Sequence, residues 1–171
     1  MSHSMVVHKG TGTIYLAEQE VIDADTQWIE YHKTLKDSAS ITQTAPDKTF
    51  INIDQATAPI ATTLGEGSFE IAYTVPDVAP EVLGLFFNTS VSTFAPSGKS
   101  GVNVSTELKV VSKMFRMDFD DGGAFIAPNC ELNAVLEKTA DGTFNINVTG
   151  SVLAHKGVGF EQAEVIFWKK D

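Results

Sequence analysis

Polar and apolar residues alternate without a fault over Ser68–Val75, and this pattern predicts a strand with one buried and one wet face. Residues 76–77 then break the strand. The segment that follows, 80–87, gathers its apolar side chains on one stripe of a helix, and these residues are Val82, Leu83, Phe86 and Phe87. Because the stripe is apolar, we expect a short helix that packs on the sheet and is not a binding site.

The same two-residue period recurs along most of the chain. It predicts further strands over residues 10–16, 28–35, 102–109, 111–119, 130–137, 143–149 and 163–168. Gly-rich and Asp-rich sequences at 120–123 and 140–142 are typical of hairpin turns. The apolar face changes sides near residues 110–111, which is typical of a bulge or of a strand that passes between two sheets. The pattern therefore predicts a mainly β fold, an antiparallel β-sandwich or partly open barrel with one short flanking α-helix.

One long segment, residues 36–67, departs from this regularity. It is rich in Thr, Ala, Asp and Pro and contains only a weak strand pattern over residues 49–54. Loops of this length are uncommon inside a compact domain unless they serve a function. With a chain of 171 residues, we expect a single β domain over 1–171 from which 36–67 extends as a long arm or loop.

Charge and composition narrow the class of partner. The formal net charge is −10, and the excess of Asp and Glu over Lys and Arg is spread evenly along the chain. Tight binding to nucleic-acid phosphates or to an anionic membrane would need clustered Lys and Arg, which the sequence lacks. The single cysteine, Cys130, forms no intrachain disulfide. Without an apolar leader or a run of about 20 apolar residues, we expect a protein kept in a reducing compartment and not in a membrane.

Four sequence features suggest chemistry, and each has a simpler interpretation. Residues 118–122 resemble a calcium loop, but the glycine comes one position early and a hairpin tip is favoured. The Gly-rich segments at 65–67 and 97–101 lack the fixed spacing of a phosphate loop. His32 is expected on the wet side of its strand, far in sequence from the other histidines, and Cys130 is expected to be a small core residue. The sequence therefore predicts no catalytic, cofactor or metal site.

The polar faces of the predicted strands form the most distinctive surface. They carry Ser, Thr, Asn and Glu with very few cations, and their charged members are Glu70, Glu107, Lys109, Glu131 and Glu137. An ordinary solvent-facing sheet explains this composition. A sheet that lines a channel for a polyanion explains it as well, because such a channel must be wet and must not hold phosphates. The residues alone leave both interpretations open.

Four segments resemble the major tail tube proteins of tailed bacteriophages. Residues 65–77 followed by 80–86 are similar to a strand and short helix of that family. Residues 126–132 are similar to the strand that begins its last hairpin, and residues 141–150 to the return strand. The resemblance covers roughly residues 60–155 and is one of pattern, without a fixed motif.

This resemblance implies a structural protein with no cofactor and no catalysis. Family members are β-sandwich subunits that form rings, usually hexameric, whose inner sheets join into one barrel. The rings stack into a tube through which DNA passes, in a virion tail that also holds tape measure and terminator proteins. Loops reach from ring to ring, so the resemblance assigns an inter-ring role to Thr49, Phe50, Ile51, Asn52, Ile53 and Asp54, and a lumen-facing role to the charged residues of the wet faces.

Two other classes remain as alternatives. A β-sandwich binding module, of the adhesin or carbohydrate-binding type, would expose aromatic side chains in a shallow groove. Trp28 and Trp168 lie in strand patterns and are expected to be structural, which argues against such a module. A small-ligand barrel of the lipocalin type would need a polar cluster in an apolar cup, and the sequence contains none. The mass of the purified protein, with images of it, distinguishes these classes from a ring.

Overall fold

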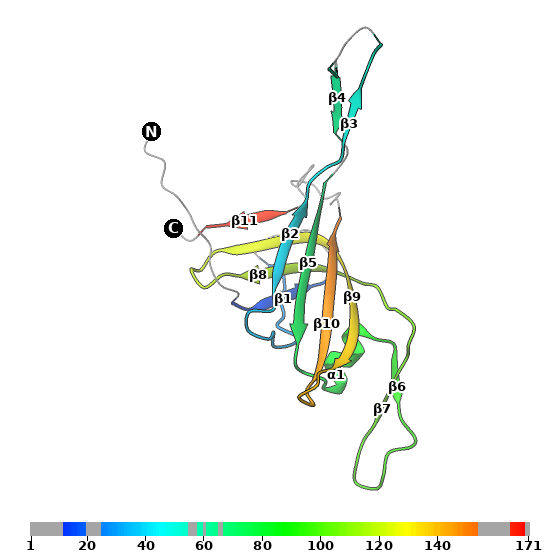
Figure 1. The fold of residues 1–171 in the computed structure, drawn as a ribbon. Coiled ribbons are helices and arrows are strands. Elements are labelled where there is room, and N and C mark those ends of the chain that lie inside the picture. Colours follow the sequence, from blue (N-terminus) through cyan, green and yellow to red (C-terminus); the bar gives the residue numbers. More distant parts are fainter. Residues whose placement is uncertain are drawn as a thin grey trace.

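A computed structural model describes residues 12–19, 25–54, 58–59, 61–64, 67–153 and 165–169, with the backbone alone for residues 62 and 64 (Figure 1). It confirms a mainly β fold in which all paired strands run antiparallel. The described elements are β1 (Ile14–Ala17), β2 (Ser40–Thr44), β3 (Lys48–Ile51), β4 (Ala61–Leu64), β5 (Ser68–Val75), α1 (Pro80–Phe86), β6 (Thr89–Val91), β7 (Val102–Val104), β8 (Val111–Asp118), β9 (Ala124–Lys138), β10 (Phe144–Val152) and β11 (Ile166–Trp168).

One sheet forms the body, with strand order β1-β8-β9-β10-β5-β2 and with β11 paired to β9. The long strand β9 belongs to two parts of this sheet. Its first half pairs with β8 and β11, and its second half pairs with β10. In Figure 1, β8 and β11 therefore run crosswise to β2, β5 and β10. The sheet folds over on itself along β9, which gives a sandwich that is open at its edges and not a closed barrel.

The core lies between these two parts of the sheet. Phe125 of β9 lies at 6.4 Å from Phe69 of β5, measured between ring centroids, and Phe115 of β8 lies at 6.0 Å from Tyr73 of β5. These contacts join residues far apart in the sequence across the sandwich. Full burial of one such side chain stabilises the fold by about 1.5–3 kcal/mol. Cys130 is also fully buried in this core, as the sequence predicts.

Helix α1 closes one end of the core. Its start is prepared by Asp77, whose carboxylate accepts a hydrogen bond of 2.9 Å from the Ala79 N–H, and by Pro80 in the first turn. The chain leaves the helix at Phe87, whose N–H donates to the Leu83 carbonyl at 2.8 Å. The predicted apolar stripe packs into the core, with three residues buried and one partly buried; these are Val82, Phe86 and Phe87, and Leu83. The helix is a packing element, as expected.

The prediction of a strand over residues 28–35 is wrong. Only one bridge forms there, between Ile29 and Leu16, and the chain then leaves the sheet. His32, expected in solvent, is only 4% exposed, whereas Tyr31 and Leu35 are exposed. Without a neighbouring strand to hold the pleat, alternation in the sequence no longer decides which side chain faces the core.

The prediction of a strand over residues 102–109 is also wrong in most of its length. The strand β7 ends at Val104 and pairs with β6 outside the main sheet, and residues 105–110 belong to no strand. The predicted exchange of faces near 110–111 therefore lies where this loop ends and β8 begins. The register shift that the structure contains is inside β8, between Lys113 and Phe115, where Met114 and Phe115 are both buried.

Two hairpins leave the body. The β3–β4 hairpin continues beyond β2 and β5, and the β6–β7 hairpin follows α1; each forms a separate two-stranded sheet. Figure 1 shows them projecting from opposite ends of the molecule. The segment 36–67 is therefore part sheet and part arm: its first strand, β2, pairs with β5 in the body, and only the part beyond β2 projects.

Candidate functional site

One face of the sheet is polar, and the strand register sets its residues in rows. The first row crosses five strands in the order β8, β9, β10, β5, β2, with Ser112, Glu131, Ser151, Glu70 and Thr42 as direct neighbours. Strands lie about 4.8 Å apart, so Glu131 and Glu70, which are separated by β10, lie about 10 Å apart on this face. The structure thus brings together two of the predicted lumen-facing residues.

The rows below it continue the same character. Their members are Asn133, Thr149, Ala72 and Ser40, then Val135, Asn147 and Thr74, then Glu137 and Asn145. We call the fourteen residues of these four rows the polar face. It includes three carboxylates and no Lys or Arg. A polyanion near this face meets negative charge and neutral hydrogen-bonding groups, and no cation that would hold a phosphate.

Side chains on the polar face are linked to one another. The Thr74 hydroxyl donates to Oδ1 of Asn147 at 3.1 Å, and Nδ2 of Asn147 donates to a carboxylate oxygen of Glu137 at 2.5 Å. This chain of hydrogen bonds spans β5, β10 and β9. It orients the Asn147 amide and holds the third predicted carboxylate, Glu137, on the face.

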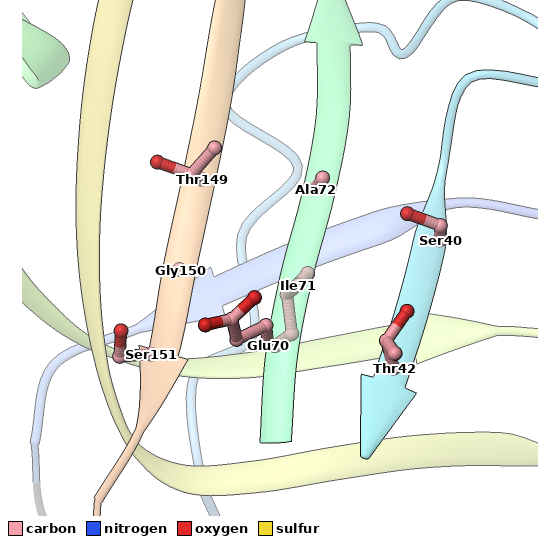
Figure 2. Close-up of a pocket in the computed structure, with 8 residues that line it drawn as sticks. All are labelled: Ser40, Thr42, Glu70, Ile71, Ala72, Thr149, Gly150 and Ser151. Carbon is pink, nitrogen blue, oxygen red and sulfur yellow. The ribbon is translucent and has the colours of Figure 1, made fainter. Parts of the chain in front are cut away.

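A shallow hollow lies on the polar face above Ala72, where the small side chain leaves space (Figure 2). Its volume is about 270 Å³. Hydroxyl groups surround it together with the carboxylate of Glu70, and they belong to Ser40, Thr42, Thr149 and Ser151. Glu70 is the single ionisable residue among those that line the hollow. It can hold water or contact a polar polymer.

The sheet ends in strand β2, and this edge is open. Within the described ranges no strand pairs with the outer side of β2. Its sequence, Ser-Ile-Thr-Gln-Thr, contains no proline and no charge, the two devices that commonly protect an exposed edge. Among the described residues, the outward N–H and C=O groups of β2 therefore have no strand partner.

The β3–β4 hairpin carries all six predicted inter-ring residues, and every one of them is exposed. Thr49, Phe50 and Ile51 lie in β3, and the other three follow it. Phe50 is 55% exposed and Ile53 is 42% exposed. Apolar side chains so exposed on a projecting hairpin are typical of a contact surface.

The second hairpin, β6–β7, was not predicted from the sequence, because Ser, Gly and Pro dominate its tip. A turn there is closed by the Lys99 N–H, which donates to the Pro96 carbonyl at 3.0 Å. Val91 and Phe94 are 84% and 91% exposed. Two short matching strand patterns on either side of a Pro-Ser-Gly turn were the signal that could have identified it.

Two predicted lumen-facing residues, Glu107 and Lys109, do not lie on a strand of the polar face. Both belong to the loop between β7 and β8, because the predicted strand over 102–109 does not form. The Lys109 ammonium instead donates to the Gly84 carbonyl at 2.9 Å, near the C-terminal end of α1, where a cation is favourable. Glu107 is exposed beside a second, apolar hollow.

On the opposite part of the sheet, Arg116 organises an aromatic cluster. Its guanidinium carbon lies 5.0 Å from the ring centroid of Tyr15, 5.9 Å from that of Trp28 and 5.1 Å from that of Trp168. Two of its nitrogens donate to the carboxylate of Asp118, at 2.7 and 3.0 Å. The cluster joins β1, the segment after it, β8 and β11, so both tryptophans pack on the structure as expected.

The features that suggested chemistry have structural explanations where they are described. Asp118 binds Arg116, and the Asp121 carboxylate accepts from the Gly123 N–H at 2.9 Å in a hairpin turn that contains Gly122 at φ 85°. Burial raises the pKa of the Cys130 thiol to about 12, so this residue is not an activated nucleophile. Residues 97–101 form the tip of the β6–β7 hairpin, and no helix follows them. The described ranges hold no cluster of three side chains suited to a metal ion.

Comparison with known proteins adds no identity. No protein-family model and no curated protein matches this chain. Among the described residues, no helix has the length and apolar character needed to cross a membrane. The polar face, the edge strand β2 and the two hairpins are the features of the molecule that bear on its function.

Proposed function

We propose that this chain is a structural subunit that assembles into stacked rings and forms a tube of the phage-tail type, a conduit for DNA. The observation that carries the proposal is the polar face, a continuous surface with carboxylates at Glu70, Glu131 and Glu137 and no cation. DNA that passes along such a face is repelled weakly at every point and is held at none. The subunit needs no cofactor for this task.

The open edge supports ring formation. In a closed ring, β2 of each subunit pairs with a neighbour, so that no exposed edge remains and the polar faces join into one inner wall. The unprotected sequence of β2 suits a strand that is exposed only before assembly. The family resemblance suggests six subunits in a ring.

The two hairpins support stacking. Because β3–β4 and β6–β7 leave opposite ends of the body (Figure 1), each can reach a subunit in the ring above or below. A head-to-tail contact of this kind repeats without limit and produces a tube. Within a virion tail, tape measure and terminator proteins would be further partners of such a tube.

The test is the mass and appearance of the purified chain. Light scattering and negative-stain images over a range of concentrations should show rings or tubes and not a monomer of 18.4 kDa. Gln43→Lys places a charge on the open edge strand and should prevent ring formation. The matched control is Gln27→Lys, an equal change at an exposed residue outside the sheet. A wild-type protein that stays monomeric at every concentration contradicts the proposal.

A second candidate function is a β-sandwich binding module of the adhesin or carbohydrate-binding type. One observation favours it: Trp168 is 43% exposed beside the rings of the Arg116 cluster and could stack against a sugar. Titration of the monomer with oligosaccharides, followed by tryptophan fluorescence, tests this function. A saturable change that Trp168→Ala abolishes would favour the binding module.

A further inference from the structure

An apolar hollow of about 370 Å³ lies beside the second half of β9. One wall is β9 beyond Leu132, the last residue of β9 that pairs with β8, and the other is the loop between β7 and β8. Its apolar lining includes Phe87, Leu108, Val135 and Leu136. Leu108 is 75% exposed and Val135 is 59% exposed, so apolar surface here faces water in the single subunit.

The β3–β4 hairpin presents the matching chemistry. In a strand, residues two apart share a face, so Lys48 and Phe50 of β3 point the same way, with an ammonium beside an apolar ring. An isolated two-stranded hairpin has little stability in water, and the described residues pair β3 only with β4. The hairpin therefore gains stability from any surface that covers Phe50.

The charged side chains beside the hollow and on the β3–β4 hairpin are complementary. Glu107 lines the hollow and is exposed, and Lys109, its nearest cation in the sequence, already donates to the Gly84 carbonyl. A carboxylate thus lies beside an apolar hollow, and the Lys48 ammonium beside the Phe50 ring is the complementary combination. The tip of β6–β7 also carries an exposed phenylalanine, Phe94, and a cation, Lys99, but it projects from the end of the molecule at which the hollow lies and does not face it in a head-to-tail stack.

The hollow adjoins α1 and the end of β9, whereas β3–β4 projects from the other end of the molecule (Figure 1). A hairpin therefore reaches the hollow of a second copy that is stacked on the first, and the contact is head-to-tail. We infer that the β3–β4 hairpin of one copy inserts Phe50 into the apolar hollow of the next copy, where Lys48 pairs with Glu107. This inference rests on the proposed stacking of rings.

Charge reversal tests the pair in the full chain. Glu107→Lys and Lys48→Glu, each alone, should reduce tube length at least several-fold in low salt while single rings still form. The double variant should restore the tubes. The control is Glu81→Lys, an equal change at an exposed residue of α1. Tubes of normal length for Glu107→Lys, or no recovery in the double variant, would overturn the inference.

Disulfide trapping tests the contact without requiring rings. Phe50→Cys and Leu108→Cys chains are mixed under air oxidation, with the buried Cys130 left in place. A linked dimer of twice the subunit mass should form, whereas Phe94→Cys mixed with Leu108→Cys should stay monomeric. A dimer without rings would preserve the contact and reject the proposed tube. The absence of a dimer, or dimerisation only with Phe94→Cys, would reject the contact even if tubes form.

Discussion

The Tyr73 hydroxyl lies 3.5 Å from Nε2 of His32, and the two rings stack with their centroids 5.5 Å apart. Phe86 of α1 lies on the same imidazole, also at 5.5 Å between centroids. One irregular segment is thus held against β5 and α1 by a histidine that is almost fully buried. Burial lowers the pKa of His32 and raises the pKa of Tyr73.

Stability should fall when the protein is acidified through the range of the histidine. The pKa of His32 is lowered on folding, chiefly by desolvation and against the opposing charges of Glu30 and Asp77, so the unfolded chain binds a proton more readily. The contribution of neutral His32 to the free energy of unfolding is fully present above pH about 6.5, the pKa of histidine in the unfolded chain. As the pH falls below this value, the contribution decreases by at most about 1.4 kcal/mol per pH unit, and it stops decreasing below the pKa of His32 in the folded protein. Chemical denaturation between pH 8 and 5 measures the slope.

Two variants separate burial from the hydroxyl contact. Tyr73→Phe removes the hydroxyl but keeps the apolar surroundings, so the pH dependence should persist. His32→Phe removes the titrating group and should flatten the curve in this range. An unchanged slope in His32→Phe would show that another group causes it.

Removal of the Phe86 ring should strongly destabilise the folded protein. This side chain is 1% exposed and packs between α1, His32 and the core, so Phe86→Ala leaves a cavity that costs about 3–5 kcal/mol. The control is Glu81→Gln, on the exposed side of the same helix, which should cost less than about 1 kcal/mol. Thermal unfolding compares the two. A well-folded Phe86→Ala protein that has lost only a binding activity would show that α1 is a recognition element.

The stability of the protein should depend on the planar shape of the Arg116 guanidinium and not only on its charge. Arg116→Lys keeps the positive charge but loses the two-point contact with Asp118 and the flat contact with the aromatic rings, at a cost of about 1–2 kcal/mol. Because the two tryptophans of the chain both contact Arg116, their fluorescence reports directly on the cluster. Lys113→Arg is the control, at a salt bridge with the exposed Glu18. Equal changes in stability and fluorescence for Arg116→Lys and Lys113→Arg would show that the aromatic cluster does not depend on the guanidinium of Arg116.

Charge reversal on the polar face tests the conduit. Glu70→Lys combined with Glu131→Lys should leave subunit stability within about 1 kcal/mol, because partly exposed charges contribute little. Assembled tubes of this variant should retain DNA at low salt and release it as salt rises. Glu81→Lys with Asp120→Lys changes the net charge equally away from the face and should retain none. Variant tubes that ignore DNA at low salt would mean that another surface lines the lumen.

Local patterns predicted the elements that neighbours in the sequence determine. The alternation in Ser68–Val75, the turns at 120–123 and 140–142, and the apolar stripe of α1 all appear in the structure. In each case a short stretch contains both the hydrophobic period and the residue that ends it. The mainly β class follows from the same information.

Long-range pairing decided where those local patterns fail. Residues 28–35 and 102–109 alternate between polar and apolar as clearly as the strands that form. Among the described residues, however, most of their length pairs with no strand, so the alternation does not decide which side chains are buried. For this reason His32 is buried in the core, and the Lys109 ammonium binds the Gly84 carbonyl of α1. The strand β6 formed at Thr89–Val91, where the sequence pattern predicted no strand, and it pairs with β7.

The sequence by itself determined the fold class, the single buried cysteine, the packing helix and an acidic surface that lacks clustered cations, because these depend on composition and on periods of two and 3.6 residues. Only the tertiary structure decided that Glu70 and Glu131 share a row while Glu107 and Lys109 leave it, and that β2 forms an open edge. The reason is physical: register and edge depend on which distant strands pair, and pairing is settled by packing across the whole core.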